Sequence, residues 1–472
     1  MRWKTTLILL TATIALGAYV SLYEIKQPSP EQREQKLKQI LSLKEADIKG
    51  LRVTTPKADV QLRLENGQWI VLPDGWRADP GMVGEIVDRI PWLSAQRSLK
   101  SDAKAPIDLK AYGLEPPQGR LAVETEKPFT LLFGDTTPIG HRRYVQIEGQ
   151  TDVHVVSTTL FEALNHPSEA FREVFLLPLR KAQPEEIVVE SPTSTIALAA
   201  QAGIWQLNNP IEDLASQEAV SSLLQKLGNL PIQRYIGNLP EGQTLESLGL
   251  EPADTQWTLA GPSYSNELAV AFGKPLSDDG TLRYAKRSDD PKLYAVKADD
   301  MASVFPEAQS LRLQACFERL NASDRIAIAF EGAEWAIEQK DGVWMQAETE
   351  AVLDEQKTAA FLAQLSDLKI THFVEKLEIQ APAAYGLEPG EGRIRVSKAD
   401  GQQQELVVGS LALEGLDGSK ETTRYAHLVE RGWIVHIPNA VESILKTKPD
   451  ALIAQLPDPE YNASPETPAA QP

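Results

Sequence analysis

An internal repeat constrains what this chain can fold into more than any other feature of its sequence. The repeat has a period of about 137 residues and is marked by landmarks that recur three times in the same order. A turn followed by tryptophan comes first, at Gly67-Gln68-Trp69, Gly203-Ile204-Trp205 and Gly342-Val343-Trp344. A Gly-Leu-Glu-Pro block follows, starting at Gly113, Gly249 and Gly386. These landmarks predict three copies of one domain.

Two further landmarks come after the Gly-Leu-Glu-Pro block of each copy. A strand ending in glycine stops at Gly134, Gly273 and Gly409. An Arg-Tyr pair follows it, at Arg143-Tyr144, Arg283-Tyr284 and Arg424-Tyr425. Because successive side chains of a strand point to opposite faces, we expect the tyrosine to face the core and the arginine to face solvent.

The segments between the landmarks also repeat in type. Short alternating or β-branched runs, such as residues 187–189 and 195–199, are separated by turn residues and predict antiparallel strands. Apolar residues spaced by three and four predict one helix in each copy, within residues 82–90, 220–227 and 361–368. We therefore predict an α+β fold, in which a single N-terminal transmembrane helix precedes three repeated domains, each a mostly antiparallel sheet with one or more packed helices.

The repeat and the chain ends together give the expected domain boundaries. We predict a cytoplasmic N-terminus at residues 1–4, a transmembrane anchor at 5–23, a stalk or linker at 24–47, repeat domains at 48–178, 182–318 and 322–452, and a disordered tail at 453–472. The length of 472 residues fits about three domains of ordinary size. The tail is polar and rich in proline, so it has too little apolar surface to form a core.

The first residues predict a membrane topology. Residues 5–23 contain no charged side chain and, at about 1.5 Å per residue, nearly cross a hydrocarbon core of about 30 Å. Arg2 and Lys4 lie on the short N-terminal side, which places the rest of the chain outside the cytoplasm. We expect a single-pass protein of the bacterial cytoplasmic (inner) membrane with a periplasmic C-terminal bulk. A cleaved signal peptide is the alternative, since Ala15-Leu16-Gly17 offers small residues, although the apolar run continues to Tyr23.

Charge and cysteine content limit the classes of partner. The chain has 47 Lys and Arg against 66 Asp and Glu, a formal net charge of −19 that repels phosphate backbones. We therefore expect no nucleic-acid partner. Cys316 is the single cysteine and cannot form an internal disulfide. Its apolar neighbours favour a core position over a nucleophile.

The Gly-Leu-Glu-Pro block could be a site, because it joins a carboxylate to a tight turn. A structural turn explains it better, since glycine, proline and leucine are the residues such a turn needs and all three copies carry them. One hypothesis pairs the arginine of each copy with the glutamate of its own block, Arg143 with Glu115, Arg283 with Glu251 and Arg424 with Glu388. The alternative for these arginines is a contact surface for an anion or a peptide.

Constellations typical of catalysis or metal binding are absent from the sequence. The six histidines show no pair at helical ligand spacing, and no glycine-rich phosphate loop or nucleophile motif occurs. The adjacent acids Asp289-Asp290 and Asp299-Asp300 are expected to be solvated. We expect no catalytic, cofactor-binding or metal-binding residues, no cofactor and no enzyme activity.

Taken together, the motifs resemble a known family. The order of Gly-x-Trp, helix, Tyr-Gly-Leu-Glu-Pro, Phe133-Gly134-Asp135 with Pro138, and Arg-Tyr looks like the bacterial domain-of-unknown-function family numbered 4340, over residues 48–452. The first copy is the clearest; the second has Leu248 for the tyrosine and the third has Val408 for the phenylalanine. The resemblance implies an association with ABC-type transporters or gliding-motility-like systems, and hence an extracytoplasmic accessory subunit.

Two classes of function follow. The first is a membrane-anchored, non-catalytic binding or scaffold module whose domains contact a transporter permease or an auxiliary protein. The second is an independent cell-envelope hydrolase or carbohydrate-binding protein with an unrecognised site. A deep pocket in one copy, lined by acids or histidines, favours the second class, whereas shallow and equivalent surfaces favour the first.

Overall fold

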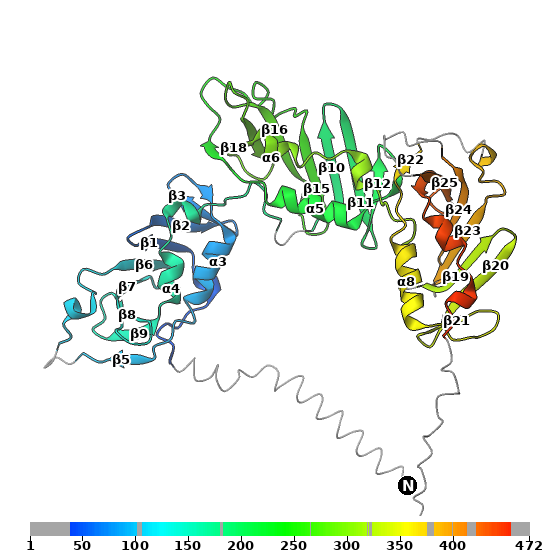
Figure 1. Ribbon diagram of the computed structural model, residues 1–472. Coiled ribbons are helices and arrows are strands. Elements are labelled where there is room, and N and C mark those ends of the chain that lie inside the picture. The colour runs from blue at the N-terminus through cyan, green and yellow to red at the C-terminus, as the bar shows by residue number, and fades with distance from the viewer. Residues whose placement is uncertain are drawn as a thin grey trace, which may run out of the picture.

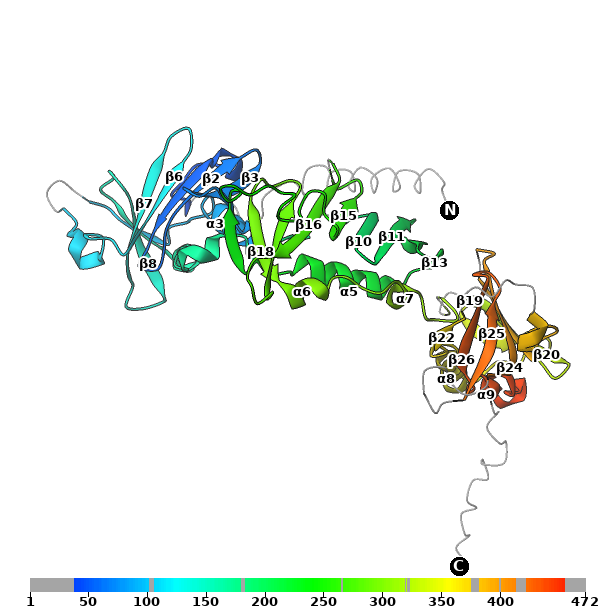
Figure 2. The same cartoon turned by 90° about the horizontal axis from the view of Figure 1, so that it is seen from above.

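The described chain forms three antiparallel sheets that follow one another in sequence and lie in a row (Figures 1 and 2). The computed structural model describes residues 38–101, 106–179, 183–264, 266–318, 320, 323–374, 382–398, 400–412 and 422–454. The predicted anchor at 5–23 lies outside these residues, as does nearly all of the predicted tail. Among the described helices, none has the length and apolar character needed to span a membrane.

The first sheet has the strand order β4-β3-β2-β1-β6-β7-β8-β9-β5. Its strands are β1 (Gly50–Thr54), β2 (Asp59–Glu65), β3 (Gln68–Leu72), β4 (Trp76–Arg77), β5 (Arg97–Leu99), β6 (Gly119–Glu124), β7 (Phe129–Thr136), β8 (Arg142–Ile147) and β9 (Val153–Ser157). Its helical segments are η2 (Glu45–Asp47), α3 (Pro80–Arg89), η3 (Leu109–Tyr112), α4 (Thr159–Leu164) and η4 (Ser168–Phe171).

The second sheet has the equivalent order, β13-β12-β11-β10-β15-β16-β17-β18-β14. Its strands are β10 (Glu186–Ser191), β11 (Ser194–Gln201), β12 (Ile204–Asn209), β13 (Asp213–Leu214), β14 (Arg234–Gly237), β15 (Gln256–Ala260), β16 (Leu268–Pro275), β17 (Leu282–Arg287) and β18 (Leu293–Lys297). Its helices are α5 (Gln217–Gly228), α6 (Ala298–Ala302) and α7 (Ala308–Leu311).

The third sheet repeats this order without the short outer strand, as β21-β20-β19-β23-β24-β25-β26-β22. Its strands are β19 (Ser323–Phe330), β20 (Ala333–Lys340), β21 (Val343–Gln346), β22 (His372–Phe373), β23 (Gly392–Lys398), β24 (Gln403–Leu411), β25 (Thr423–Leu428) and β26 (Trp433–Pro438). Its helical segments are α8 (Glu355–Ser366), η6 (Pro382–Tyr385), α9 (Val441–Leu445) and η7 (Pro449–Ala451). Antiparallel sheets with few helices fit the predicted α+β class.

The longest helix of each sheet begins at a side chain that caps it. Asp79, Ser216 and Asp354 precede α3, α5 and α8, and each accepts a hydrogen bond from a backbone N–H of the first helical turn. Such a cap satisfies one of the donors that a helix start leaves without a partner. A polar residue just before an apolar periodic run therefore fixes where each helix begins.

The landmark glycine of each copy is required by a close backbone approach. A Cβ at Gly134, Gly273 or Gly409 would lie 2.2–2.3 Å from the carbonyl oxygen of the residue before the glycine of the Gly-Leu-Glu-Pro block. The strand pairing shifts register beside each of these glycines, so the strand bulges toward that turn. The glycine of each Gly-Leu-Glu-Pro block has a φ of 65–69°, which confirms its role in a tight turn.

The landmark arginines face the helix side of the sheet, and the prediction that they face solvent is wrong. The guanidinium groups of Arg143, Arg283 and Arg424 donate to the carbonyls of Gly134, Gly273 and Gly409. The bulge takes these carbonyls out of the regular ladder, so each needs another donor. The tyrosines occupy the opposite face, where Tyr144 and Tyr284 pack in small separate clusters.

The predicted ion pairs of these arginines with the block glutamates do not form among the described residues. Glu115, Glu251 and Glu388 are exposed at their turns. Arg424 pairs instead with Glu391 at 2.6 Å and with Glu442 of α9 at 3.4 Å. Arg143 lies over the ring of Phe161 in α4, 3.8 Å from its centroid. Arg143 and Arg424 therefore link the bulge of their own sheet to the short helix that follows the last long strand.

The first and second sheets share one apolar core, whereas the third sheet has its own. One continuous cluster of buried side chains extends through the first and second sheets, from Leu41 to Leu311. A separate cluster fills the third sheet, and Ile211 of the second sheet packs against it. Leu41 belongs to the segment predicted to be a stalk, yet it is buried against the first sheet. The boundary between the second and third sheets is thus the point where the core is interrupted.

Candidate functional site: two buried ionic junctions between sheets

Buried charge concentrates where one sheet meets the next. Glu173, Arg287 and Asp290 lie at the boundary of the first and second sheets and are each about 6% exposed or less. Arg312, at the boundary of the second and third sheets, is 1% exposed. Charged side chains are rarely buried unless they are paired, so these boundaries are built for a specific arrangement.

The chain crosses each boundary by the same route. A linker residue first pairs with the outer edge of its own sheet, Ala78 with Arg172 and Ala215 with Arg312. Three residues later the linker pairs with the next sheet, where Phe175 meets Pro231 and Ala315 meets Lys369. The two junctions are therefore equivalent in backbone geometry, and their side chains can be compared position by position.

The segment that precedes the first sheet docks in the corresponding place. Gln39 forms an isolated bridge with Ser94, and the N–H of Ile40 donates to the carbonyl of Leu93 at 3.1 Å. These residues occupy on the first sheet the position that the linkers occupy on the second and third.

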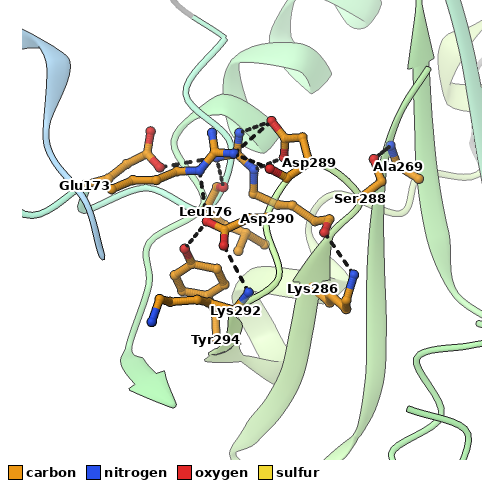
Figure 3. Close-up of polar contacts among 11 residues, drawn as sticks. Glu173, Leu176, Ala269, Lys286, Ser288, Asp289, Asp290, Lys292 and Tyr294 are labelled. Atoms are coloured by element: carbon orange, nitrogen blue, oxygen red, sulfur yellow. Dashed lines mark hydrogen bonds and ion pairs between the residues drawn. The ribbon is translucent and has the colours of Figure 1, made fainter. Parts of the chain in front are cut away.

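At the first junction, one guanidinium group joins the linker to a hairpin of the second sheet. Nη1 of Arg287 donates to Oε2 of Glu173 at 3.2 Å and to the carbonyl of Leu176 at 3.0 Å. Its Nε and Nη2 bind the two carboxylate oxygens of Asp289, each at 2.9 Å. Figure 3 shows Glu173 reaching from the linker toward the β17–β18 hairpin, which carries Asp289 and Asp290.

A second arginine reaches the same hairpin from the first sheet. Nε of Arg77, in β4, donates to Oδ2 of Asp290 at 2.9 Å, and its Nη2 donates to the carbonyl of Asp289 at 2.6 Å. The hydroxyl of Tyr294 donates to the same Oδ2 at 2.7 Å. The Asp290 carboxylate is thus fixed by groups from both sheets.

Aromatic rings cover this ionic cluster. Trp76 lies against Tyr235 and Tyr294, with ring centroids 5.1 and 5.6 Å away. The ammonium of Lys292 lies 4.9 Å from the Trp76 ring centroid. The hydroxyl of Tyr235 donates to the carbonyl of Glu173 at 2.6 Å. The Arg77–Asp290 and Glu173–Arg287 pairs are thereby shielded from water, which strengthens their electrostatic interactions, whereas the Asp289 side chain is 41% exposed.

The burial changes how these groups titrate. Burial raises the pKa of Glu173 to about 7, although the charges of Arg287 and Arg77 oppose the shift. Burial also raises the pKa of Tyr235 to about 12. Burial also acts to raise the pKa of Asp289, but the hydrogen bond and charge of Arg287 outweigh it and hold this pKa below the usual value. Glu173 is therefore a buried carboxyl group that titrates near neutral pH.

The second junction is centred on one buried acid held by two arginines. Asp213, in β13, has a side chain that is 1% exposed. Nη2 of Arg312 lies 2.7 Å from its Oδ2, and Arg431 binds both carboxylate oxygens at 2.9 and 3.0 Å. The Arg312 guanidinium also lies between two rings of the third sheet, 3.3 Å from the centroid of Phe373 and 4.1 Å from that of Trp433.

Backbone groups of the linker complete the second junction. Arg431 donates to the carbonyl of Leu313 at 2.9 Å and to that of Ala315 at 3.3 Å. Cys316 is buried beside this contact, and burial raises the pKa of its thiol to about 12. The expectation that Cys316 is a core residue fits this position.

The sequence prediction for Asp289 and Asp290 is the one that the structure corrects most clearly. These acids were expected to be solvated, but Asp290 is 6% exposed and both bind Arg77. The partner is more than 200 residues away in the sequence, so local context gave no signal of it. In contrast, Asp299 is exposed in the first turn of α6.

Shallow hollows accompany the sheets at different places. A hollow of about 360 Å³ lies beside α5 and is lined by Leu179, Trp205 and Leu224 among others. Another of about 320 Å³ lies at the second junction, beside Glu405 and Arg431. In the part of the chain that the structure describes, no group of three or more His, Cys, Asp or Glu side chains could hold a metal ion.

Comparison with known proteins gives a family. A family model described as "Domain of unknown function (DUF4340)" matches residues 69–241 and 205–390. The two matches begin at Trp69 and Trp205, which are the same landmark of successive copies, and each runs from one sheet into the next. No curated protein and no solved structure matches the chain. The matched unit therefore includes a junction as well as a sheet.

Proposed function

The chain belongs to the DUF4340 family of domains of unknown function, and on this premise we propose that it is a non-catalytic scaffold. In this role it is anchored in the cytoplasmic membrane by residues 5–23 and holds three sheets outside the cytoplasm for protein partners. The partner that its resemblance suggests is a transporter permease or an auxiliary protein of an ABC-type or gliding-motility-like system.

The observation that supports this role is the burial of complementary charge at both junctions. Asp213 and Arg312 are both 1% exposed, and each charge is paired. A buried ion pair contributes little net stability, because desolvation offsets its attraction, but it penalises every arrangement that separates the charges. Domains in one chain otherwise move relative to one another by default. Junctions of this kind fix the relative positions of three surfaces, which is what a scaffold requires.

The anchor adds to this role through effective concentration. A module tethered to the membrane meets a membrane partner at a much higher local concentration than a free one. Weak contacts made by each of three sheets can then combine, provided that their spacing matches the partner. Loss of a junction should therefore weaken the interaction even when each sheet remains folded.

The proposal is tested by capturing partners from the native membrane. The full chain with a C-terminal tag is crosslinked in its own cells, purified and identified by mass spectrometry, together with Asp213→Ala and the neighbouring exposed control Glu212→Ala. We expect a transporter permease or auxiliary protein with the wild type and the control, and a clear loss with Asp213→Ala.

Recovery of the tagged protein alone, under conditions that capture a known membrane complex, would contradict the scaffold. It would favour an independent envelope hydrolase or carbohydrate-binding protein instead. The topology is tested separately: the chain should remain in the membrane after carbonate extraction and be cleaved by protease added to the periplasmic side.

A further inference from the structure

Equivalent hairpins receive the preceding sheet at both junctions. In the second sheet Ala285 pairs with Tyr294, and in the third sheet Ala426 pairs with Val435, across loops of the same length. Both alanines also pair with the residue just before the landmark glycine. Asp290 and Arg431 therefore occupy the same position of the β17–β18 and β25–β26 hairpins, and they carry opposite charges.

The facing strands carry the complementary inversion. Arg77 in β4 binds Asp290, and Asp213 in β13 binds Arg431, with N–O distances of 2.9 Å at both junctions. β4 and β13 are the outermost strands of their sheets and contain two residues each. The strand register aligns Arg77 with Leu214 and Asp213 with Trp76, so the two side chains come from adjacent positions of equivalent strands. The charge that the edge strand offers to the hairpin is thus reversed between the two junctions.

We infer that this exchange of charge determines which sheet seats on which, and excludes pairing with the wrong hairpin of the same chain or of a second copy. The inference goes beyond the scaffold role, because it concerns assembly whatever the partner is. Placing the β4 edge on the β25–β26 hairpin brings Arg77 against Arg431. Placing the β13 edge on the β17–β18 hairpin of a second copy brings Asp213 against Asp290. Like charges in a contact that excludes water repel strongly.

The contact of an arginine with an aromatic ring at each junction does not discriminate between hairpins. Arg172 lies over the ring of Tyr235 at the first junction, and Arg312 lies over the ring of Phe373 at the second. These arginines occupy equivalent linker positions, and the rings occupy equivalent positions of β14 and β22. An arginine over an aromatic ring would form in the right and the wrong pairing alike, so selection between hairpins falls to the ion pairs. These are Arg77–Asp290 and Glu173–Arg287 at the first junction and Asp213–Arg431 at the second.

The two ends of the row lack the ion pair between edge strand and hairpin. In the first sheet, Gln150 of the β8–β9 hairpin stands where Asp290 and Arg431 stand, and Ser98 of β5 stands where Tyr235 and Phe373 stand. Ser98 bonds instead to Nδ1 of His154 at 2.9 Å. At the other end, the third sheet presents Val352, which is uncharged and 52% exposed. The aromatic and charged residues that contact a neighbouring sheet are thus present at the two internal junctions, and other residues replace them at the two ends.

A single substitution should give the β17–β18 hairpin of the second sheet the charge that the β25–β26 hairpin carries in the third sheet. The full chain is purified in detergent, unfolded in urea and refolded by dilution at several protein concentrations, and the monomer fraction is measured by light scattering. Asp290→Arg places like charges at the native first junction and offers Asp213 of a second copy a matching partner. We expect its monomer recovery to fall about tenfold, and to fall further at higher protein concentration.

Two further variants separate charge selection from a failure to fold. Asp290→Asn removes the charge without reversing it and leaves Arg77 bonded to Asp289, so recovery should stay within about twofold of wild type. Arg77→Asp combined with Asp290→Arg restores the pairing with the same set of charges and should recover the monomer. Equal recovery for Asp290→Arg and Asp290→Asn, or no recovery in the double variant, would overturn the inference.

Discussion

The first and second junctions use the same backbone route but hold their sheets by different means. At the first, the apolar core continues from one sheet to the next, and Trp76 lies within it. At the second, the cores are separate, and the main contact is one acid between two arginines. Apolar contacts tolerate small shifts, whereas a buried ion pair does not. We therefore expect the first junction to be the more stable and the second to depend more strongly on its exact geometry.

The comparison predicts which boundary fails first. A junction that depends on polar complementarity has little apolar burial to retain it once a charge is lost. Removal of one group at the second junction should therefore release the third sheet as a unit. Removal of one group at the first should weaken a core that both sheets share.

The largest effect is expected for Asp213→Ala. The substitution leaves Arg312 and Arg431 as buried positive charges without their acid, which costs about 5 kcal/mol. We expect unfolding in urea to change from shared transitions to an early separate transition of the third sheet. Glu212→Ala, at the adjacent exposed position, should leave the curve unchanged. A single unshifted transition for Asp213→Ala would show that the charge cluster does not hold this boundary.

Trp76→Ala should have the next largest effect, at the first junction. It removes a side chain that is 6% exposed and touches rings of the second sheet, at a cost of about 4 kcal/mol. Because the two sheets share one core, we expect both to lose stability together, as measured by hydrogen exchange in β3 and in β18. Trp92→Ala is the matched control, since Trp92 is 54% exposed in the turn that follows α3. Loss of protection in one sheet alone would contradict a shared core.

The sheets were predictable from the sequence because their landmark residues are required by contacts with nearby residues of the same copy. Gly134 is required by a carbonyl that approaches its Cα, and Asp79 caps the helix that begins one residue later. Both constraints involve neighbours within a single copy. The order and type of the elements could therefore be predicted with no knowledge of how the copies meet.

The junctions were not predictable, because their partners come from different copies. Asp290 in its own segment looks like a solvated loop acid, and its burial depends on Arg77 of another sheet. The direction of Arg143 was missed for a related reason: the carbonyl it binds loses its strand partner only at a bulge. The opposite charges of Asp290 and Arg431 are a sequence signal of the junctions. This signal can be recognised only after the β17–β18 and β25–β26 hairpins have been aligned by their strand registers.

The pH dependence of Glu173 offers a smaller but specific test of the first junction. Burial raises the folded-state pKa of Glu173 from 4.5 to about 7. The folded chain therefore holds a proton that the unfolded chain releases, and the resulting stability is full below about pH 4.5 and lost as the pH rises through about 7. Glu173→Gln does not titrate, so its stability relative to wild type should rise by about 2–3 kcal/mol from pH 4.5 to pH 8.

The control for this test is Glu186→Gln at an exposed position of β10, measured by urea unfolding at the same pH values. Its stability relative to wild type should be flat with pH. A flat difference for Glu173→Gln as well would mean that the carboxylate stays ionised beside Arg287. The first junction would then resemble the second, where a buried acid remains in a tight arginine contact.

The smallest effect is expected away from both junctions, and it tests whether burial is what makes their ion pairs matter. Arg52 and Asp59 form a 2.7 Å ion pair within the first sheet, but their side chains are 51% and 64% exposed. Arg52→Ala should change the free energy of unfolding by about 0.5 kcal/mol or less, because water screens the pair and the side chains are costly to order. Urea unfolding at low and high salt measures this. A loss as large as that of Asp213→Ala would mean that charge alone, irrespective of burial, stabilises this fold, and the contrast between the junctions would need another cause.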